Sequence, residues 1–438
     1  MLAVTIVAAL IAAGAIAALF SSKGKFAAER TKLQDEIARL TQEKTAIQAE
    51  LGDFREKLSS EEGKLPQLNG QIKSLQGQVA ELQEKLTQAE KGVERARIEQ
   101  TSQRAFFARK ARDTFEVFKQ KIAAEGFPER IEDLDKPGAH KTLSDEAKRI
   151  LKDIESWMEQ GGLDDANILH VLARIDYARG DAKRAELRLR AASRTTSDPL
   201  LWENLGDLMR LTGRNKRAIE GYKNAAKNSK EDSGVFKKLG LALFASSDYS
   251  AAVKPLMASL ATNTGDLDLH LKTARALIES GDYQRAVDLT HQAAKKFTKA
   301  PEVPALAVVA FAKMKRFADA QRYYQKAIDI DPKSPDAHIA RGFAYLDEGK
   351  TADAVTSFTK ALAADPKRED AYYGLGTAAN RTQNWEEALR NLKKAVELKP
   401  EYAEGWYAMK TTFEGLKKFE SAVEALNKAV TLNPHLTA

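Results

Sequence analysis

The residue types that usually carry out chemistry are sparse in this chain of 438 residues. It has no cysteine, which excludes disulfides, thiolate nucleophiles, iron–sulfur clusters and cysteine zinc sites. The six histidines are scattered, and neither an HExxH motif nor a histidine pair spaced for a metal occurs. We therefore predict no catalytic residue, no metal site, no cofactor and no enzymatic activity.

One triplet matches part of a nucleotide-binding motif. Gly349-Lys350-Thr351 has the end of a phosphate-binding loop, but Ala344 stands where the motif needs its first glycine, and no strand precedes it. We interpret Gly349 as a turn between two helices. Basic residues outnumber acidic ones by only 69 to 62, and no recognition motif accompanies this excess, so we expect no nucleic-acid partner.

The chain contains few of the residues that interrupt helices. Glycine (25) and proline (12) make up about 8% of it, against a usual ~12%. With 43% hydrophobic and 30% charged residues, the composition excludes a disordered acidic chain and a membrane protein with many spans. We predict an all-α protein in which a membrane anchor, a stalk and a helical solenoid follow one another.

An uncharged apolar segment stands at the start of the sequence, over residues 2–20. As a helix it would be about 28 Å long, close to the ~30 Å hydrocarbon core of a bilayer. We predict a single transmembrane anchor over residues 1–22. A cleaved secretory signal is the alternative, because Ala15-Ile16-Ala17 offers small residues at a cleavage site, although no lysine or arginine precedes the apolar core.

Basic residues follow the apolar segment. By the positive-inside rule we expect the rest of the chain in the cytoplasm, as in a single-pass protein of a bacterial inner membrane. The periplasmic side is the alternative. The basic residues are Lys23, Lys25, Arg30 and Lys32.

A heptad pattern runs through the predicted coiled-coil stalk, residues 26–125. Mostly apolar residues recur at 3-4 spacing from Leu33 to Gln100, with charged residues and glutamines between them. Isoleucine or valine at one core position and leucine at the other favours two parallel strands, so we predict a homodimer through the coiled coil. Pro66 indicates either a kink in one rod or a hairpin, and the unbroken heptad phase favours the kinked rod.

Two glycines and two prolines mark residues 126–143 as a predicted linker. A short amphipathic helix is predicted over residues 144–162, with Ser144 as its N-cap and Gly161 near its end. We expect this helix to cap the exposed edge of the domain that follows.

Small residues recur with a period of 34 in the C-terminal part of the chain. Such a period, with two small residues seven apart, is typical of helix pairs whose second members pack closely. A proline repeats with the same period at 332, 366, 400 and 434. The first series is Ala218, Ala252, Ala286, Ala320, Ala354, Ala388 and Ala422, and the second is Ala225, Ser259, Ala293, Ala327, Ala361, Ala395 and Ala429.

These residues resemble the tetratricopeptide repeat (TPR) family, and the resemblance covers residues 166–438. It implies a right-handed superhelix of eight repeats, in which the first helix of each pair lines a concave groove that binds peptides or helices of other proteins. Pro304 departs from the family pattern, because an aromatic residue is usual there. The predicted units begin at Ala166, Pro199, Ser233, Leu267, Pro301, Pro335, Glu369 and Ala403.

The inner positions of the first helices form a mostly apolar stripe. We predict that this stripe is a partner-binding groove for an amphipathic helix or an extended segment, with Phe343 and Tyr373 as anchors. The alternative is that these side chains only complete the packing between neighbouring first helices. The stripe comprises Leu241, Phe244, Leu271, Ile278, Val309, Ile339, Phe343, Leu346, Tyr373 and Tyr407.

Together these features predict a membrane-anchored scaffold that recruits other proteins through a TPR groove. Anchoring and dimerisation would raise the effective concentration of weakly bound partners. The layout resembles that of bacterial inner-membrane TPR proteins. The alternatives are an exported periplasmic TPR protein for envelope or appendage assembly, and a regulatory subunit of an enzyme complex.

Overall fold

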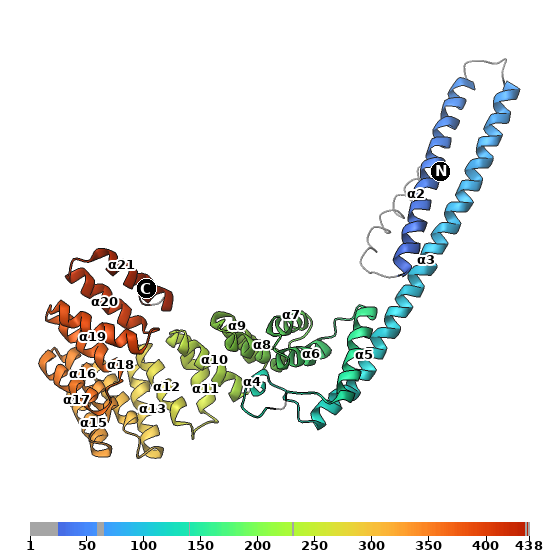
Figure 1. Cartoon of the computed structure of the whole chain (residues 1–438). Coiled ribbons are helices and arrows are strands. Elements are labelled where there is room, and N and C mark those ends of the chain that lie inside the picture. Colours follow the sequence, from blue (N-terminus) through green and yellow to red (C-terminus); the bar gives the residue numbers. More distant parts are fainter. Residues whose placement is uncertain (1–24, 59–64, 140, 230–231, 434–435, 437–438) are drawn as a thin grey trace. The chain divides into compact units, whose positions relative to one another are not determined.

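The computed structural model describes residues 25–58, 65–139, 141–229, 232–433 and 436, and these ranges contain helices and no strand (Figure 1). The all-α prediction is confirmed for them. The predicted anchor at residues 1–22 lies outside the described residues, and none of the described helices has the length and apolarity needed to cross a membrane. The chain forms two compact units, one of residues up to 126 with 143–164, the other of residues 127–142 with 165–438.

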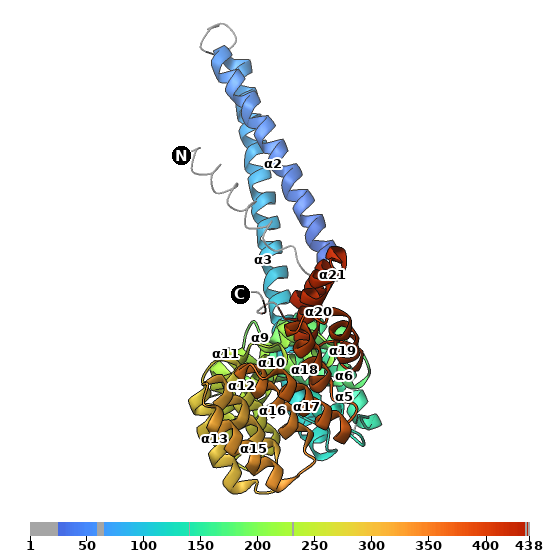
Figure 2. The ribbon, with the colours of Figure 1, turned by 90° about the vertical axis from the view of Figure 1, so that its left-hand side faces the viewer.

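Two long helices of the first unit pair with each other. Helix α2 (Lys25–Leu58) and α3 (Leu65–Ala124) lie side by side and run in opposite directions (Figures 1 and 2). Lys44 donates a hydrogen bond to Gln83, while Gly92 lies beside Leu33. The apolar heptad positions face this contact, and Leu40, Leu82, Leu86 and Val93 are buried in it.

The antiparallel pairing corrects the kinked rod favoured by the sequence. The heptad phase identified the apolar face correctly, but a phase does not specify which helix covers that face. Pro66 is the second residue of α3, where a helix does not need the N–H that proline lacks. The same chain therefore covers the seam that was expected to bind a second chain in parallel.

The predicted amphipathic helix is α5 (Asp145–Gly161), which packs along α3 in the first unit. Ser144 is its N-cap as predicted, since its side chain accepts a hydrogen bond from the Ala147 N–H. Ile154 of α5 and Phe118 of α3 are both fully buried. The expectation that this helix caps the solenoid is corrected, because its apolar face is covered by α3.

Residues 127–142, predicted as a linker, belong to the second unit. They include the one-turn helix α4 (Ile131–Leu134), which packs on the first helices of the first two solenoid pairs. Ile131 and Leu134 are fully buried there. This segment, instead of α5, covers the beginning of the solenoid.

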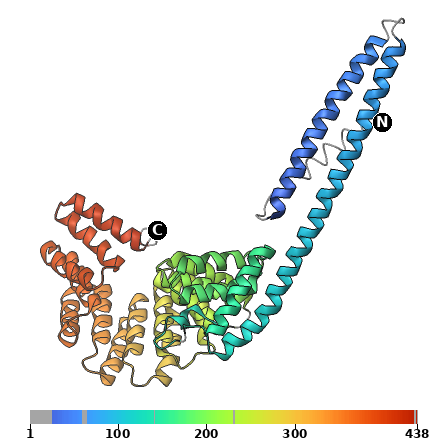
Figure 3. The same ribbon diagram turned by 45° about the vertical axis from the view of Figure 1, so that its right-hand side comes forward.

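Eight helix pairs follow one another in the described part of the second unit (Figure 3). Seven first helices begin at the residue given by the repeat spacing, and α14 begins one residue after Pro301. The first helices are α6 (Ala166–Ala178), α8 (Pro199–Leu211), α10 (Ser233–Ala245), α12 (Leu267–Glu279), α14 (Glu302–Lys313), α16 (Pro335–Glu348), α18 (Glu369–Arg381) and α20 (Ala403–Gly415). The second helices are α7 (Ala182–Ala192), α9 (Asn215–Asn228), α11 (Tyr249–Leu260), α13 (Tyr283–Lys296), α15 (Phe317–Ile330), α17 (Thr351–Ala364), α19 (Trp385–Leu398) and α21 (Phe419–Leu432).

Each second helix packs on its own first helix, and each except α21 also packs on the first helix of the next pair. The recurring alanines make these approaches close, and Ala218, Ala286, Ala354 and Ala388 are almost completely buried. From α10 to α20, consecutive first helices also pack on one another. The first helices therefore lie on the inner side of the curve, and they position the candidate groove.

Candidate functional site

The ten predicted groove residues lie at two depths in the first helices. Ile278, Ile339 and Leu346 are buried, so they contribute to packing between helices. The others are half-buried, which leaves part of each side chain on the surface: Leu241, Phe244, Leu271, Val309, Phe343, Tyr373 and Tyr407. Part of the stripe therefore packs between neighbouring first helices, and part of it remains accessible to a partner; these are the two roles that the sequence left open.

Aromatic rings connect the last three repeats along the groove. The Phe343 ring on α16 lies 5.9 Å from that of Tyr373 on α18, which lies 5.2 Å from Tyr402, centroid to centroid. Phe343 also contacts the fully buried Phe358 of α17, with centroids 5.0 Å apart. We call Phe343, Tyr373 and Tyr402 the aromatic row. Tyr402 is buried, while Phe343 and Tyr373 are half-buried, so these two rings rest on the core and offer a rigid apolar surface.

A polar wall that the sequence analysis missed faces part of this row. Arg275 on α12 lies 3.8 Å from Asp370 on α18, although three repeats separate the two residues in the sequence. The Tyr402 hydroxyl donates a hydrogen bond to the same Asp370 carboxylate, at 3.0 Å. The curve of the solenoid therefore brings its fourth repeat against its seventh and eighth. The period of 34 alone does not specify how far the solenoid curves.

The electrostatics of this region reflect burial and crowded carboxylates. Glu279 on α12 is exposed at the surface, but desolvation by the surrounding protein raises the pKa of its carboxyl, Arg275 partly offsets the rise, and Glu404 adds to it. The Arg275 side chain is 54% exposed; desolvation by nearby protein atoms opposes its charge, but Asp370 and Glu279 outweigh it, so the pKa of the guanidinium is raised. Burial raises the pKa of Tyr373 as well, which therefore keeps its hydroxyl proton at neutral pH.

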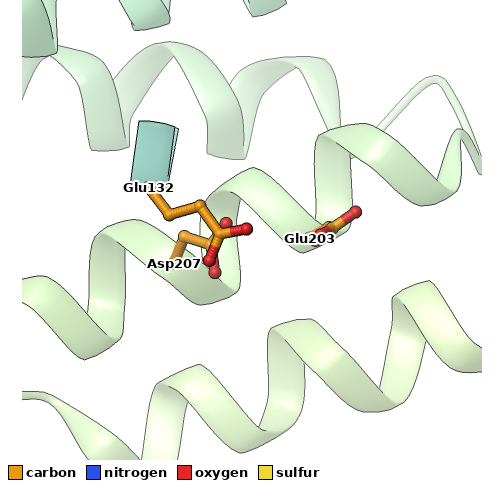
Figure 4. Close-up of side chains that lie close together, drawn as sticks. All are labelled: Glu132, Glu203 and Asp207. Carbon is orange, nitrogen blue, oxygen red and sulfur yellow. The ribbon is translucent and has the colours of Figure 1, made fainter. Parts of the chain in front are cut away.

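A second polar cluster lies where α4 meets the solenoid. The Lys238 ammonium of α10 lies 2.6 Å from Glu132, 2.7 Å from Glu203 and 2.9 Å from Asp207. Figure 4 shows Glu132 reaching from α4 toward Asp207 on α8, with Glu203 one turn away on the same helix. Glu203 and Asp207 are buried, and Lys238 is the cation that they share, while Arg130 also lies 3.5 Å from Glu203.

The three carboxylates have oxygen atoms within 4.8 Å of one another, a spacing that suits a metal ion. The ammonium group of Lys238 fills the space between them and donates hydrogen bonds to Glu203 and Asp207. We therefore interpret the cluster as a buried ion-pair network that fixes α4 on the solenoid. Glu203 and Asp207 lie four residues apart among leucines, but their burial depends on a segment that was predicted as a linker.

Comparison with known proteins identifies the repeats. The tetratricopeptide repeat model matches residues 271–335, 305–367, 339–403 and 373–437. No curated protein matches the sequence.

Several solved structures are similar to the chain. A tetratricopeptide repeat protein from Parabacteroides merdae is 17% identical, with 57% of this chain and 98% of that chain covered and a TM-score of 0.46. YrrB, described as a TPR protein with an unusual peptide-binding site, is 18% identical, with coverages of 42% and 95% and a TM-score of 0.28. MamA from Desulfovibrio magneticus is 20% identical, with coverages of 39% and 97% and a TM-score of 0.29.

Proposed function

We propose that this chain, whose residues 271–437 match the tetratricopeptide repeat model, acts as a membrane-anchored scaffold whose groove holds a segment of another protein. TPR repeats are protein-interaction scaffolds, so no catalytic step is part of the proposal. The groove would take an apolar peptide or one face of an amphipathic helix.

The observation that supports this proposal best is the aromatic row. Tyrosine and phenylalanine provide large contact areas with little conformational freedom to lose, and such residues dominate the binding energy of many interfaces. Phe343 and Tyr373 remain half-buried even though they pack on the core. Tyr407 on the next first helix extends the same surface.

We expect a photocrosslinking residue at Tyr407 to capture partner proteins in intact cells, with the products identified by mass spectrometry. The matched control places the same residue at Lys393, an exposed position on the second helix α19. Combining Phe343→Leu with Tyr373→Leu should remove the Tyr407 products, because it replaces the rings while keeping apolar side chains. Identical products at both positions, or products that survive the leucine substitutions, would contradict a groove-bound partner.

We also propose that residues 1–22 anchor the chain in a membrane with the solenoid in the cytoplasm. The uncharged apolar segment and the basic residues after it support this topology. The full-length chain should stay with membranes after high-salt and carbonate washing, whereas a chain lacking residues 2–20 should be released. Release of the full-length chain would argue against the anchor.

A reporter fused after Ala438 tests the side of the membrane. Fluorescent protein should fluoresce and alkaline phosphatase should stay inactive if the solenoid is cytoplasmic. The opposite pattern would favour the exported protein for envelope or appendage assembly.

A further inference from the structure

The groove has two walls that lie far apart in the sequence. One wall contains Tyr249 at the start of α11 with Arg275 and Glu279 of α12, and the other contains Asp370 and Tyr373 of α18 with Tyr402 and Glu404. The 3.8 Å approach of Arg275 to Asp370 joins the walls directly. Glu279 follows Arg275 by one helical turn on α12, and Glu404 follows Tyr402, whose hydroxyl donates a hydrogen bond to Asp370. We call this region the two-walled groove.

Carboxylates outnumber cations in the two-walled groove. Asp370 has Arg275 as its partner at 3.8 Å, and Arg368 lies 3.7 Å from the same carboxylate. Lys313, the other cation near Glu279, forms an ion pair with Asp347 at 3.0 Å. Within the described part of the chain, no ion pair shorter than 4.0 Å is found for Glu279 or Glu404.

Arg368 in turn pairs with Asp336 at 2.8 Å, so counting it leaves the balance of charge unchanged. The two-walled groove therefore has two negative charges more than positive ones, contributed by Glu279 and Glu404. Glu279 is exposed and Glu404 is half-buried, so both carboxylates are accessible to a cation of a bound partner.

Aromatic rings accompany these two carboxylates. Tyr249 is half-buried, and its ring lies 5.3 Å from that of Phe244, centroid to centroid. On the opposite wall, Tyr373 is half-buried and packs on Tyr402. Tyrosine faces attract lysine and arginine side chains, and carboxylates form charge-assisted hydrogen bonds with them. The chemistry of both walls is thus complementary to a cationic side chain.

We propose that the two-walled groove binds a lysine or arginine side chain of the docked protein segment, with Glu279 and Glu404 as its ionic partners and Tyr249 and Tyr373 as aromatic walls. The proposal rests on the proposed function, because it assumes that a segment of another protein enters the groove. It specifies the partner further, as a basic residue with apolar neighbours that contact the aromatic row.

A random 12-residue peptide display library, selected on the full-length chain, tests the proposal. Peptides selected on the wild type should be enriched in lysine and arginine. Glu279→Gln with Glu404→Gln should abolish that enrichment, whereas the control pair Glu386→Gln and Glu401→Gln, both exposed and outside the groove, should keep it. In a selected peptide, replacing the basic residue with norleucine should weaken binding to the wild type about tenfold or more, by roughly the 1.4 kcal/mol that a tenfold change represents.

The outcomes separate this proposal from the proposed function. If peptides bind and Phe343→Leu with Tyr373→Leu abolishes their binding, but lysine and arginine are not enriched, the cationic site is wrong and the docking groove stands. If the basic enrichment is equal on the wild type and the Glu279 and Glu404 variant, the site lies elsewhere on the chain. If no selected peptide depends on the groove residues, the docking function fails together with this inference.

Discussion

Replacing Lys238 with methionine should destabilise the first repeats by about 3–5 kcal/mol, because it removes the ion-pair partner of the buried Asp207 and leaves the buried Glu203 with Arg130 alone, at 3.5 Å. Glu203 and Asp207 are 2% and 0% exposed, so water cannot replace the lost ammonium. In a solenoid each repeat contacts mainly its neighbours, so the loss should remain local. Hydrogen exchange of the α8 and α10 amides should accelerate, while that of α16 and α18 stays unchanged.

The neighbouring Lys237 provides a matched control. It pairs with Asp266 at 2.5 Å, but both side chains are partly exposed, and Lys237→Met should cost only about 0–1 kcal/mol. Adding Asp207→Asn and Glu203→Gln to Lys238→Met should restore part of the lost protection. Equal effects of the two lysine variants would contradict the interpretation of the cluster as a buried network.

The Lys238 variant should also respond to pH. Burial raises the pKa of Asp207, Lys238 partly offsets this rise, and the pKa stays above its ordinary value. A carboxyl group with a raised pKa contributes stability when it is protonated, and this contribution is lost as the pH rises through its folded-state pKa. Without Lys238 that pKa should rise further. The exchange defect of the variant should therefore be smaller at pH 5 than at pH 8.

The helix pairs could be predicted from the sequence because their spacing follows from close packing. Alanine recurs wherever two helices approach closely, and the 34-residue period sets where each pair begins. A second regularity also has this period. The turn inside each pair contains one residue with a left-handed backbone conformation. In four turns this residue is a glycine, at 180, 213, 281 and 349, and in the other four it is Ser247, Lys315, Gln383 or Lys417.

Features that depend on distant contacts could not be predicted in the same way. The heptads identified the apolar face of residues 33–100, but whether a second chain or the same chain covers that face depends on the loop, not on the period. In the same way, Arg275 and Asp370 meet only because the solenoid curves by a particular amount. Glu203 and Asp207 suit an exposed helix face until residues 127–142 pack over them.

Removing the Phe358 ring should have a comparably large effect on the C-terminal repeats. Phe358 is fully buried between two first helices, α16 and α18, at the positions of Gly342 and Gly374. A methyl group on Gly342 would lie 2.5 Å from its ring, and one on Gly374 would contact the ring still more closely. Phe358→Ala should cost about 3–5 kcal/mol, and Gly374→Ala about 1–3 kcal/mol through overpacking. The loss of stability in each variant can be measured by thermal unfolding and by hydrogen exchange of α16 to α18.

Gly77→Ala is the control for the glycine substitution, because a methyl group at this exposed helical position meets no atom within 4 Å. Alanine should stabilise α3 there by up to about 1 kcal/mol. Gly374→Ala should cost less when Phe358→Leu is already present, since the two side chains share one space and their effects are not additive. If Gly374→Ala were as harmless as Gly77→Ala, the ring would not be held between the glycines.

The same ring connects stability to the proposed function. Phe358 supports Phe343, and Phe343 begins the aromatic row that continues through Tyr373. Phe358→Ala should therefore weaken partner crosslinking at Tyr407 even at a temperature where the C-terminal repeats stay folded. Gly374→Ala should weaken it less, because the methyl group displaces the ring without removing it. Undiminished crosslinking in the folded Phe358→Ala variant would show that partner binding does not depend on the contact between Phe358 and Phe343.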